Sequence, residues 1–129
     1  MSIDATGVLV ELMDGWQRAF SGHRLTELVS MFSPDALFQG VDPRLRVGHA
    51  EIREYYTGVV PGTTAVAEVL RATRPGPAIV GGFADVTFTA PTGGIRRVRL
   101  SVVAGRTPGG GWLIEQYHAT EQHLPGPDQ

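Results

Sequence analysis

The segment "GWLIEQYHAT", residues 111–120, contains the side chains best suited to proton transfer. An unperturbed histidine has a pKa near neutrality, so His118 can take up or release a proton at physiological pH. Its neighbour Tyr117 carries a phenol that can donate a hydrogen bond. We therefore take His118 and Tyr117 as candidate catalytic residues. The alternative for His118 is a hydrogen bond at the end of a sheet or in a dimer interface, because no carboxylate at a fixed spacing identifies an orienting partner.

A second group of candidates comes from the charged residues of the predicted strands. Arg97 and Arg99 are two residues apart, so they project from the same face of a strand. A pair of guanidinium groups can hold a carboxylate, a phosphate or an enolate oxygen. The alternative is a solvated strand face on which the arginines pair across to Glu115 or Asp85. All four are candidate ligand-binding residues.

The composition argues against several other chemistries. The chain has no cysteine, so disulfides and thiolate metal sites are excluded, and it has no lysine for a Schiff base. His23, His49 and His123 show no metal-ligand spacing, and we expect neither a metal nor a cofactor. The net charge of -2 argues against nucleic-acid binding. Without a signal peptide or an apolar run of ~20 residues, we expect no membrane partner and a cytoplasmic location.

The first half of the chain reads as helices around one short strand. Apolar residues at three- and four-residue spacing predict a helix over 8–20, which includes Trp16 and Phe20. A shorter helix follows over 24–32, a turn at "SPDA", a strand over 36–40 with Phe38, and a loop or irregular edge over 41–47. A third helix over 48–60 carries Tyr55 and Tyr56. These aromatic residues are the apolar part of the candidate ligand-binding set.

The second half alternates with period two and is rich in β-branched residues. Four strands are predicted, over 65–74, 78–89, 95–106 and 111–122, separated by glycine- and proline-rich turns. Consecutive strands of this kind form an antiparallel meander. The sequence predicts one α+β domain over 1–129, with helices on one face of the sheet and a frayed tail over 124–129.

Four motifs occur in the order found in one known family. They are "W-x3-F" from Trp16, "L-x3-F-x-PDALF" from Leu28, "G-x3-IREYY" from Gly48 and "GW-x-I-x3-HAT" from Gly111. Together they resemble the SnoaL-like branch of the nuclear transport factor 2-like superfamily, and within it the SgcJ/EcaC-type proteins of natural-product clusters. The end of the chain also resembles the association domain of calmodulin-dependent protein kinase.

The resemblance implies a cone, in which a strongly bent antiparallel sheet wraps round the N-terminal helices and leaves a single pocket. It also implies a homodimer through the outer face of the sheet. Family members include isomerases, cyclases, dehydratases and non-catalytic domains, so the fold alone does not give the function. We expect a cofactor-free isomerase, cyclase or dehydratase-type enzyme acting on a hydrophobic, oxygenated or polyketide-derived intermediate of natural-product biosynthesis. The alternative is a non-catalytic ligand carrier or dimeric assembly domain.

Strict alternation divides the strand residues between two faces, and two interpretations stay open. The first, which we favour, points a mixed set into the cone and leaves the apolar set for the dimer interface. The second buries the apolar set under the helices and puts His118 at the pocket rim. In either case, Tyr117 and His118 cannot both enter one cavity unless a bulge intervenes. The mixed set is Phe83, Asp85, Thr87, Arg97, Arg99, Ser101, Val103, Leu113, Glu115 and Tyr117; the apolar set is Val86, Phe88, Val98, Leu100, Val102, Trp112, Ile114, Gln116 and His118.

Overall fold

The computed structural model describes residues 4–122, so the predicted tail over 124–129 lies outside the described residues. Three helices come first: α1 (Ala5–Ser21), α2 (Leu25–Ser30) and, after two strands, α3 (Gly48–Thr57). Helix α1 begins where the Asp4 carboxylate accepts the backbone N–H of Gly7 at 2.6 Å, an N-cap that satisfies a free helix donor. The apolar stripe predicted for this helix is buried along its whole length.

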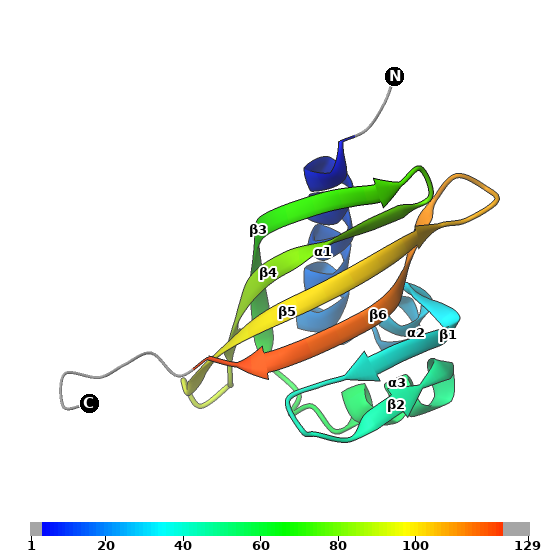
Figure 1. Cartoon of the computed structure of the whole chain (residues 1–129). Coiled ribbons are helices and arrows are strands. Elements are labelled where there is room, and N and C mark those ends of the chain that lie inside the picture. Colours follow the sequence, from blue (N-terminus) through cyan, green and yellow to red (C-terminus); the bar gives the residue numbers. More distant parts are fainter. Residues whose placement is uncertain (1–3, 123–129) are drawn as a thin grey trace.

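The strands form one six-stranded sheet in the order β2-β1-β6-β5-β4-β3 (Figure 1). Their bounds are Phe32–Gln39 for β1, Leu45–Val47 for β2, Thr64–Gly76 for β3, Ile79–Thr89 for β4, Ile95–Arg106 for β5 and Trp112–Glu121 for β6. The predicted meander is present in β3 to β6, where each strand pairs antiparallel with the next. Strand β1 adds to it in parallel with β6.

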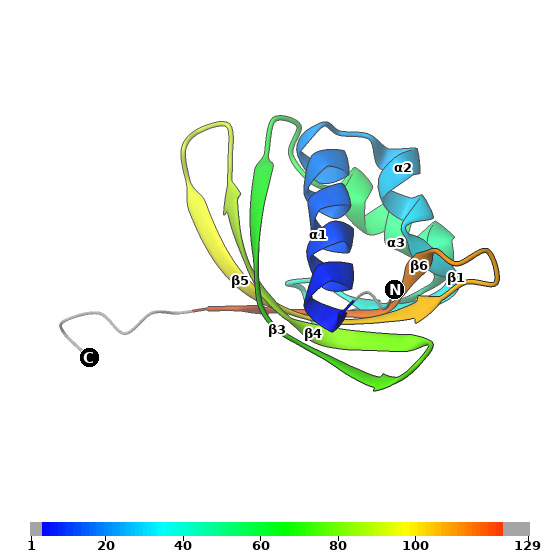
Figure 2. The same ribbon diagram turned by 90° about the horizontal axis from the view of Figure 1, so that it is seen from above.

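The sheet is strongly bent, and α1 lies in its concave side (Figure 2). Residues from α1 and from the inner face of the sheet form one hydrophobic core, with Leu9, Trp16 and Leu100 fully buried. This core removes the apolar stripe of α1 from water. The α+β cone expected from the sequence is therefore confirmed.

Two local expectations change. The predicted turn at "SPDA" is instead an irregular part of β1, which begins at Phe32 and shifts register between Phe32 and Leu37. The predicted irregular edge contains the short strand β2, which pairs with the end of β1. On this edge strand the apolar residues Leu45 and Val47 are exposed, while Arg46 between them is buried.

A β-bulge in β6 breaks the alternation that both interpretations of the strand faces assumed. On β5, the neighbours Val103 and Ala104 pair with Gln116 and Ile114, so Glu115 is an extra residue without a partner. Ile114 is buried, Glu115 and Gln116 are both exposed, and Tyr117 is buried again. The bulge thus turns Tyr117 into the cone and His118 out of it.

The favoured interpretation of the faces is wrong. The apolar residues Val86, Val98, Leu100 and Val102 are buried under the helices, as the second interpretation expected. Placing the mixed set inside would have buried the charges of Asp85, Arg97, Arg99 and Glu115 together, which is costly. Of the mixed set, only Tyr117 faces inward. The outer or exposed side of the strands carries its charged members Asp85, Arg97, Arg99 and Glu115, and also His118 of the apolar set.

Candidate functional site

A cavity of about 700 Å³ opens at the wide end of the cone. Its volume lies in the range of small-molecule sites, about 300–1,000 Å³. Helix α3, the loop that follows it, the loop between β1 and β2, and the turn between β4 and β5 surround the opening. The described lining residues are Phe20, Val41, Asp42, Arg46, Glu54, Tyr55, Tyr56, Gly58, Val59, Val60, Thr63, Phe88, Ala90, Gly94, Ile95, Arg96 and Tyr117.

The inner wall of the cavity carries a buried chain of hydrogen bonds. The indole Nε1 of Trp16 donates to the phenol oxygen of Tyr56 at 3.0 Å. The phenol of Tyr117 lies against that of Tyr56, and each phenol affects the pKa of the other. Trp16 comes from α1, Tyr56 from α3 and Tyr117 from β6, so the chain joins three elements that are far apart in the sequence. All three side chains are almost fully buried.

Burial keeps these phenols protonated. Desolvation is the main cause that raises the pKa of Tyr56 and of Tyr117, because the charged phenolate is disfavoured away from water. The Trp16 N–H works in the other direction on Tyr56, since it stabilises negative charge on that oxygen. Burial also raises the pKa of Tyr55. At neutral pH the site therefore presents O–H groups and no phenolate.

Aromatic packing fixes the position of Tyr117. Its ring stacks on that of Phe38, with centroids 4.6 Å apart and planes at 4°. Phe38 in turn meets the ring of Tyr55 edge to face at 4.9 Å. Gly40 lies directly against the Tyr55 ring, where a Cβ would clash. Such pairs add to the free energy of burial and restrict ring orientation, so this wall is rigid.

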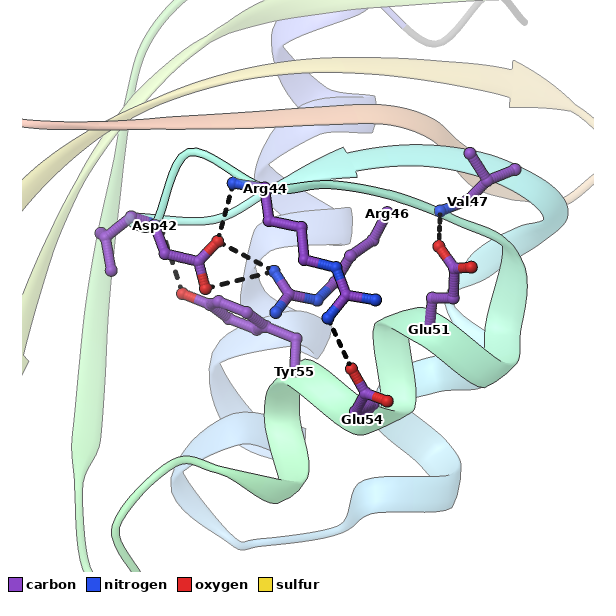
Figure 3. A network of polar contacts seen from close by, with 8 residues as sticks. Asp42, Arg44, Arg46, Val47, Glu51, Glu54 and Tyr55 are labelled. Atoms are coloured by element: carbon purple, nitrogen blue, oxygen red, sulfur yellow. Dashed lines mark hydrogen bonds and ion pairs between the residues drawn. The ribbon is translucent and has the colours of Figure 1, made fainter.

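The mouth of the cavity carries a pair of opposite charges, Arg46 and Asp42 (Figure 3). The Arg46 side chain is only 8% exposed and lies over the Tyr55 ring, 5.0 Å from its centroid. Its Nη1 donates to both Asp42 oxygens, at 3.0 and 3.3 Å, while its buried Nε has no hydrogen-bond partner. An unsatisfied buried donor costs about 1–3 kcal/mol, so this guanidinium is not fully matched by its surroundings.

Asp42 is ionised under all ordinary conditions. The hydrogen bond from Arg46 holds the pKa of Asp42 below its usual value, and the backbone N–H of Arg44 at 2.9 Å adds to the effect. The other carboxylate of the described lining, Glu54, pairs with Arg44 at 3.1 Å near the protein surface. Each carboxylate at the mouth therefore has an arginine as counter-ion.

The structure brings together part of the predicted site. Phe20, Tyr55, Tyr56 and Tyr117 line the cavity. Trp16 and Phe38 lie behind this lining, where they hold Tyr56 and Tyr117 in place.

The charged candidates lie elsewhere. On the outer face, Arg99 forms two hydrogen bonds to Asp85 across the strands, at 2.8 and 3.1 Å, and Arg97 is exposed nearby. The Glu115 carboxylate accepts a hydrogen bond from the Ser33 hydroxyl at 3.0 Å. The expectation that these four residues and His118 lie at the pocket is therefore wrong.

Sequence reasoning did not identify Arg46 and Asp42 as residues of the site. The only available signal was that Arg46 alternates with Leu45 and Val47, and alternation there suggests that the apolar pair is buried. An edge strand with its apolar side chains outward reverses that inference.

This combination of a bent sheet, a helix in its concavity (Figure 2) and a cavity at the wide end defines a cone-shaped α+β fold. The chain belongs to the SnoaL-like domain family, whose sequence pattern matches residues 9–120. A comparison with curated protein sequences finds no match. Within the described residues, no group of three or more His, Asp or Glu side chains could hold a metal ion, and no helix is long and apolar enough to cross a membrane.

Solved structures share the fold at low sequence identity. A ketosteroid isomerase-like protein from Erwinia carotovora atroseptica has a TM-score of 0.80 and 15% identity, over 95% of this chain and 100% of its own. A domain with a cystatin-like fold from Nostoc punctiforme has a TM-score of 0.83 and 17% identity, over 96% of this chain and 81% of its own. A hexachlorocyclohexane dehydrochlorinase from Novosphingobium barchaimii has a TM-score of 0.77 and 14% identity, over 94% of this chain and 88% of its own. Such likeness establishes the fold and leaves the chemistry to the residues of the site.

The buried phenols predict a loss of stability at high pH. Because the pKa values of Tyr56 and Tyr117 are raised in the folded state, their stabilising effect is complete below pH 10.0, the ordinary tyrosine value, and is lost as pH rises above it. The free energy of unfolding should fall by about 1.4 kcal/mol per pH unit for each tyrosine that stays protonated. Urea unfolding at several pH values, with phenolate absorbance of the folded protein, measures this. Tyrosine ionisation near pH 10.0 with the fold intact would contradict it.

Proposed function

We propose that the cavity binds a hydrophobic, oxygenated small molecule and catalyses cofactor-free proton transfer on it, as in an isomerase, cyclase or dehydratase. The observation that carries the proposal is the hydrogen-bond chain of Trp16, Tyr56 and Tyr117. It contains three donor groups, one N–H and two O–H, and contacts among these three side chains use at most two of them. One phenol proton is left over for an oxygen atom of a bound ligand.

Such a donor suits a reaction in which negative charge develops on oxygen. Removal of a proton next to a carbonyl produces an enolate, and a hydroxyl in an apolar, water-poor site stabilises it without having to reorganise. The indole N–H of Trp16 polarises the phenol of Tyr56 and makes it the stronger donor. In this proposal the free phenol proton of Tyr56 holds the ligand oxygen, and Asp42, ionised at the cavity mouth, takes the proton from the ligand.

The size and lining of the cavity support the substrate class. Phe20, Phe88, Val59 and Ile95 supply apolar surface, and the polar groups are few and grouped. This arrangement fits a compact ring system with carbonyl or hydroxyl groups. Membership in the SnoaL-like domain family supports a polyketide-derived intermediate of natural-product biosynthesis as the specific case.

A second candidate is a ligand carrier without catalysis. It is favoured by the pairing of both lining carboxylates with arginines and by the lack of a histidine among the described lining residues. A carrier would use the same phenol to hold a ligand oxygen but would leave its protons in place.

We also propose that the chain forms a homodimer through the outer face of the sheet. Phe83 lies on the outer face of β4, is 50% exposed, and is flanked across the strands by Arg71 and Ser101. His118 continues the same row beyond Ser101. An exposed aromatic side chain surrounded by polar groups is typical of the centre of an interface.

A ketone and a matched hydrocarbon test the ligand site. We expect 2-acetylnaphthalene to bind to the wild-type protein and to bind about tenfold more weakly to Tyr56→Phe, because the phenol no longer donates to its carbonyl. Binding of 2-ethylnaphthalene, which has no oxygen, should not change. Calorimetric titration measures both. The control His118→Ala should bind both ligands like the wild type, since His118 lies on the outer face.

The same ketone separates an enzyme from a carrier. In D₂O an enzyme should accelerate exchange of the protons next to the carbonyl, measured by proton NMR, and Tyr56→Phe and Asp42→Asn should each slow that exchange. Binding without accelerated exchange would favour the carrier. Failure of both ligands to bind would contradict the proposed site.

The dimer has its own test. We expect the wild-type protein to sediment with the mass of two chains and Phe83→Asp to sediment as one chain, because a buried carboxylate without a partner disfavours association. Val10→Asp is the matched control, since Val10 is also exposed but lies on α1. A wild-type monomer, or an unchanged dimer in Phe83→Asp, would contradict this interface.

A further inference from the structure

Arg46 is the most deeply buried cation of the cavity wall. Its register on β2 places it opposite Phe38, and its guanidinium lies over the Tyr55 ring. The side chain is 8% exposed, so it has lost nearly all contact with water. A guanidinium has five N–H donors, and a buried one is stable only if acceptors replace the lost water.

The Asp42 carboxylate supplies only some of the hydrogen-bond acceptors that the buried Arg46 guanidinium has lost. Both of its oxygens meet the same nitrogen, Nη1, at 3.0 and 3.3 Å (Figure 3). A well-matched carboxylate meets two nitrogens of the guanidinium in parallel, which gives a stronger and more directional contact. The Nε of Arg46 is buried and has no partner. Arg46 thus has donors beyond those that Asp42 uses.

The two members of the pair differ in how firmly they are held. Arg46 is fixed by strand pairing and by the Tyr55 ring. Asp42 lies in the loop between β1 and β2, and its side chain is 48% exposed. Asp42 can therefore turn into solvent and be hydrated there, while Arg46 cannot leave the cavity wall.

We propose that the cavity takes ligands with a carboxylate group, which replaces Asp42 on Arg46 and binds two of its nitrogens. Asp42 acts as the internal counter-ion of the ligand-free protein. The inference rests on the proposed function of the cavity as a small-molecule site and adds the ligand class to it: a monoanionic acid with a hydrophobic body.

The charges at the mouth favour one negative charge on the ligand. Arg96 also lines the cavity, but it is already paired with Glu121 at 2.8 Å, and Arg44 is paired with Glu54. A phosphate dianion would meet only Arg46 as an incompletely matched cation while Asp42 and Glu54 remain nearby. A carboxylate matches Arg46 in charge and in planar geometry.

Two probes of equal size test the proposal, 2-naphthoate and its neutral amide, 2-naphthamide. The wild-type protein should bind the acid about tenfold more tightly than the amide. Arg46→Gln should abolish this preference and leave amide binding intact. Arg44→Gln, which removes a cation whose side chain is 58% exposed, should keep the preference. Calorimetric titration measures the affinity for the acid and for the amide in the wild type, in these two variants and in Asp42→Asn.

Asp42→Asn supplies the decisive variant. If Asp42 is a displaceable counter-ion, its neutral form no longer competes with the ligand, so naphthoate should bind several-fold more tightly while naphthamide is unchanged. Naphthoate should also raise the melting temperature of Asp42→Asn more than that of the wild type, because it restores a partner to Arg46. This variant keeps the inference testable even if Arg46→Gln does not fold.

Three results would overturn the inference: equal binding of acid and amide by the wild type, a preference that survives in Arg46→Gln, or naphthoate binding that is weaker or unchanged in Asp42→Asn. Any of these, together with binding of 2-acetylnaphthalene, would leave the proposed function standing. If the ketone, the acid and the amide all fail to bind, the proposed function fails and this inference fails with it.

Discussion

Glu115 is the extra residue of a β-bulge in β6, and the side chains on either side of it take their faces from that one insertion. Ser33 holds its carboxylate at 3.0 Å. Gly105 leaves the space it occupies, since a Cβ there would lie 2.7 Å from a Glu115 oxygen. Without the bulge, His118 would face the cavity and Tyr117 would face outward. The cavity chemistry therefore depends on this local break in the strand.

The rest of the site follows from how Tyr117 is held once it points inward. Its ring stacks on Phe38, and its phenol reaches Tyr56, which accepts the indole N–H of Trp16. Strand, sheet edge and two helices are thereby connected through buried aromatic side chains. The donor at the inner wall is rigid, while the charged pair of Asp42 and Arg46 lies at the mouth, where one partner is half exposed. The cavity thus has a fixed inner wall and an adaptable rim.

Much of the fold was predictable because it depends on periodicity. The apolar stripe of α1 and the alternation of β3 to β6 are visible in the sequence, and the order of motifs adds the bend of the sheet. The parallel pairing of β1 with β6 has no local signature, because it joins segments about 80 residues apart whose contact depends on the whole sheet. The site was predicted where it depends on aromatic residues, which come from helices and from strands β1 and β6. The bulge at Glu115 was not predicted because it breaks the alternation of β6, and the inward Arg46 was not predicted because β2 turns its apolar side chains outward.

The natural absence of cysteine allows the bulge to be measured residue by residue. Single variants from Ile114→Cys to Thr120→Cys, each in an otherwise thiol-free chain that also carries Phe83→Asp to keep the outer face open, can be tested for their rate of reaction with a thiol reagent under native conditions. The bulge predicts fast reaction at the two consecutive positions 115 and 116, slow reaction at 117 and 119, and fast reaction at 118. Strict alternation through the strand, with 118 slow and 117 fast, would show that Tyr117 does not face the cavity and would contradict the account of the site.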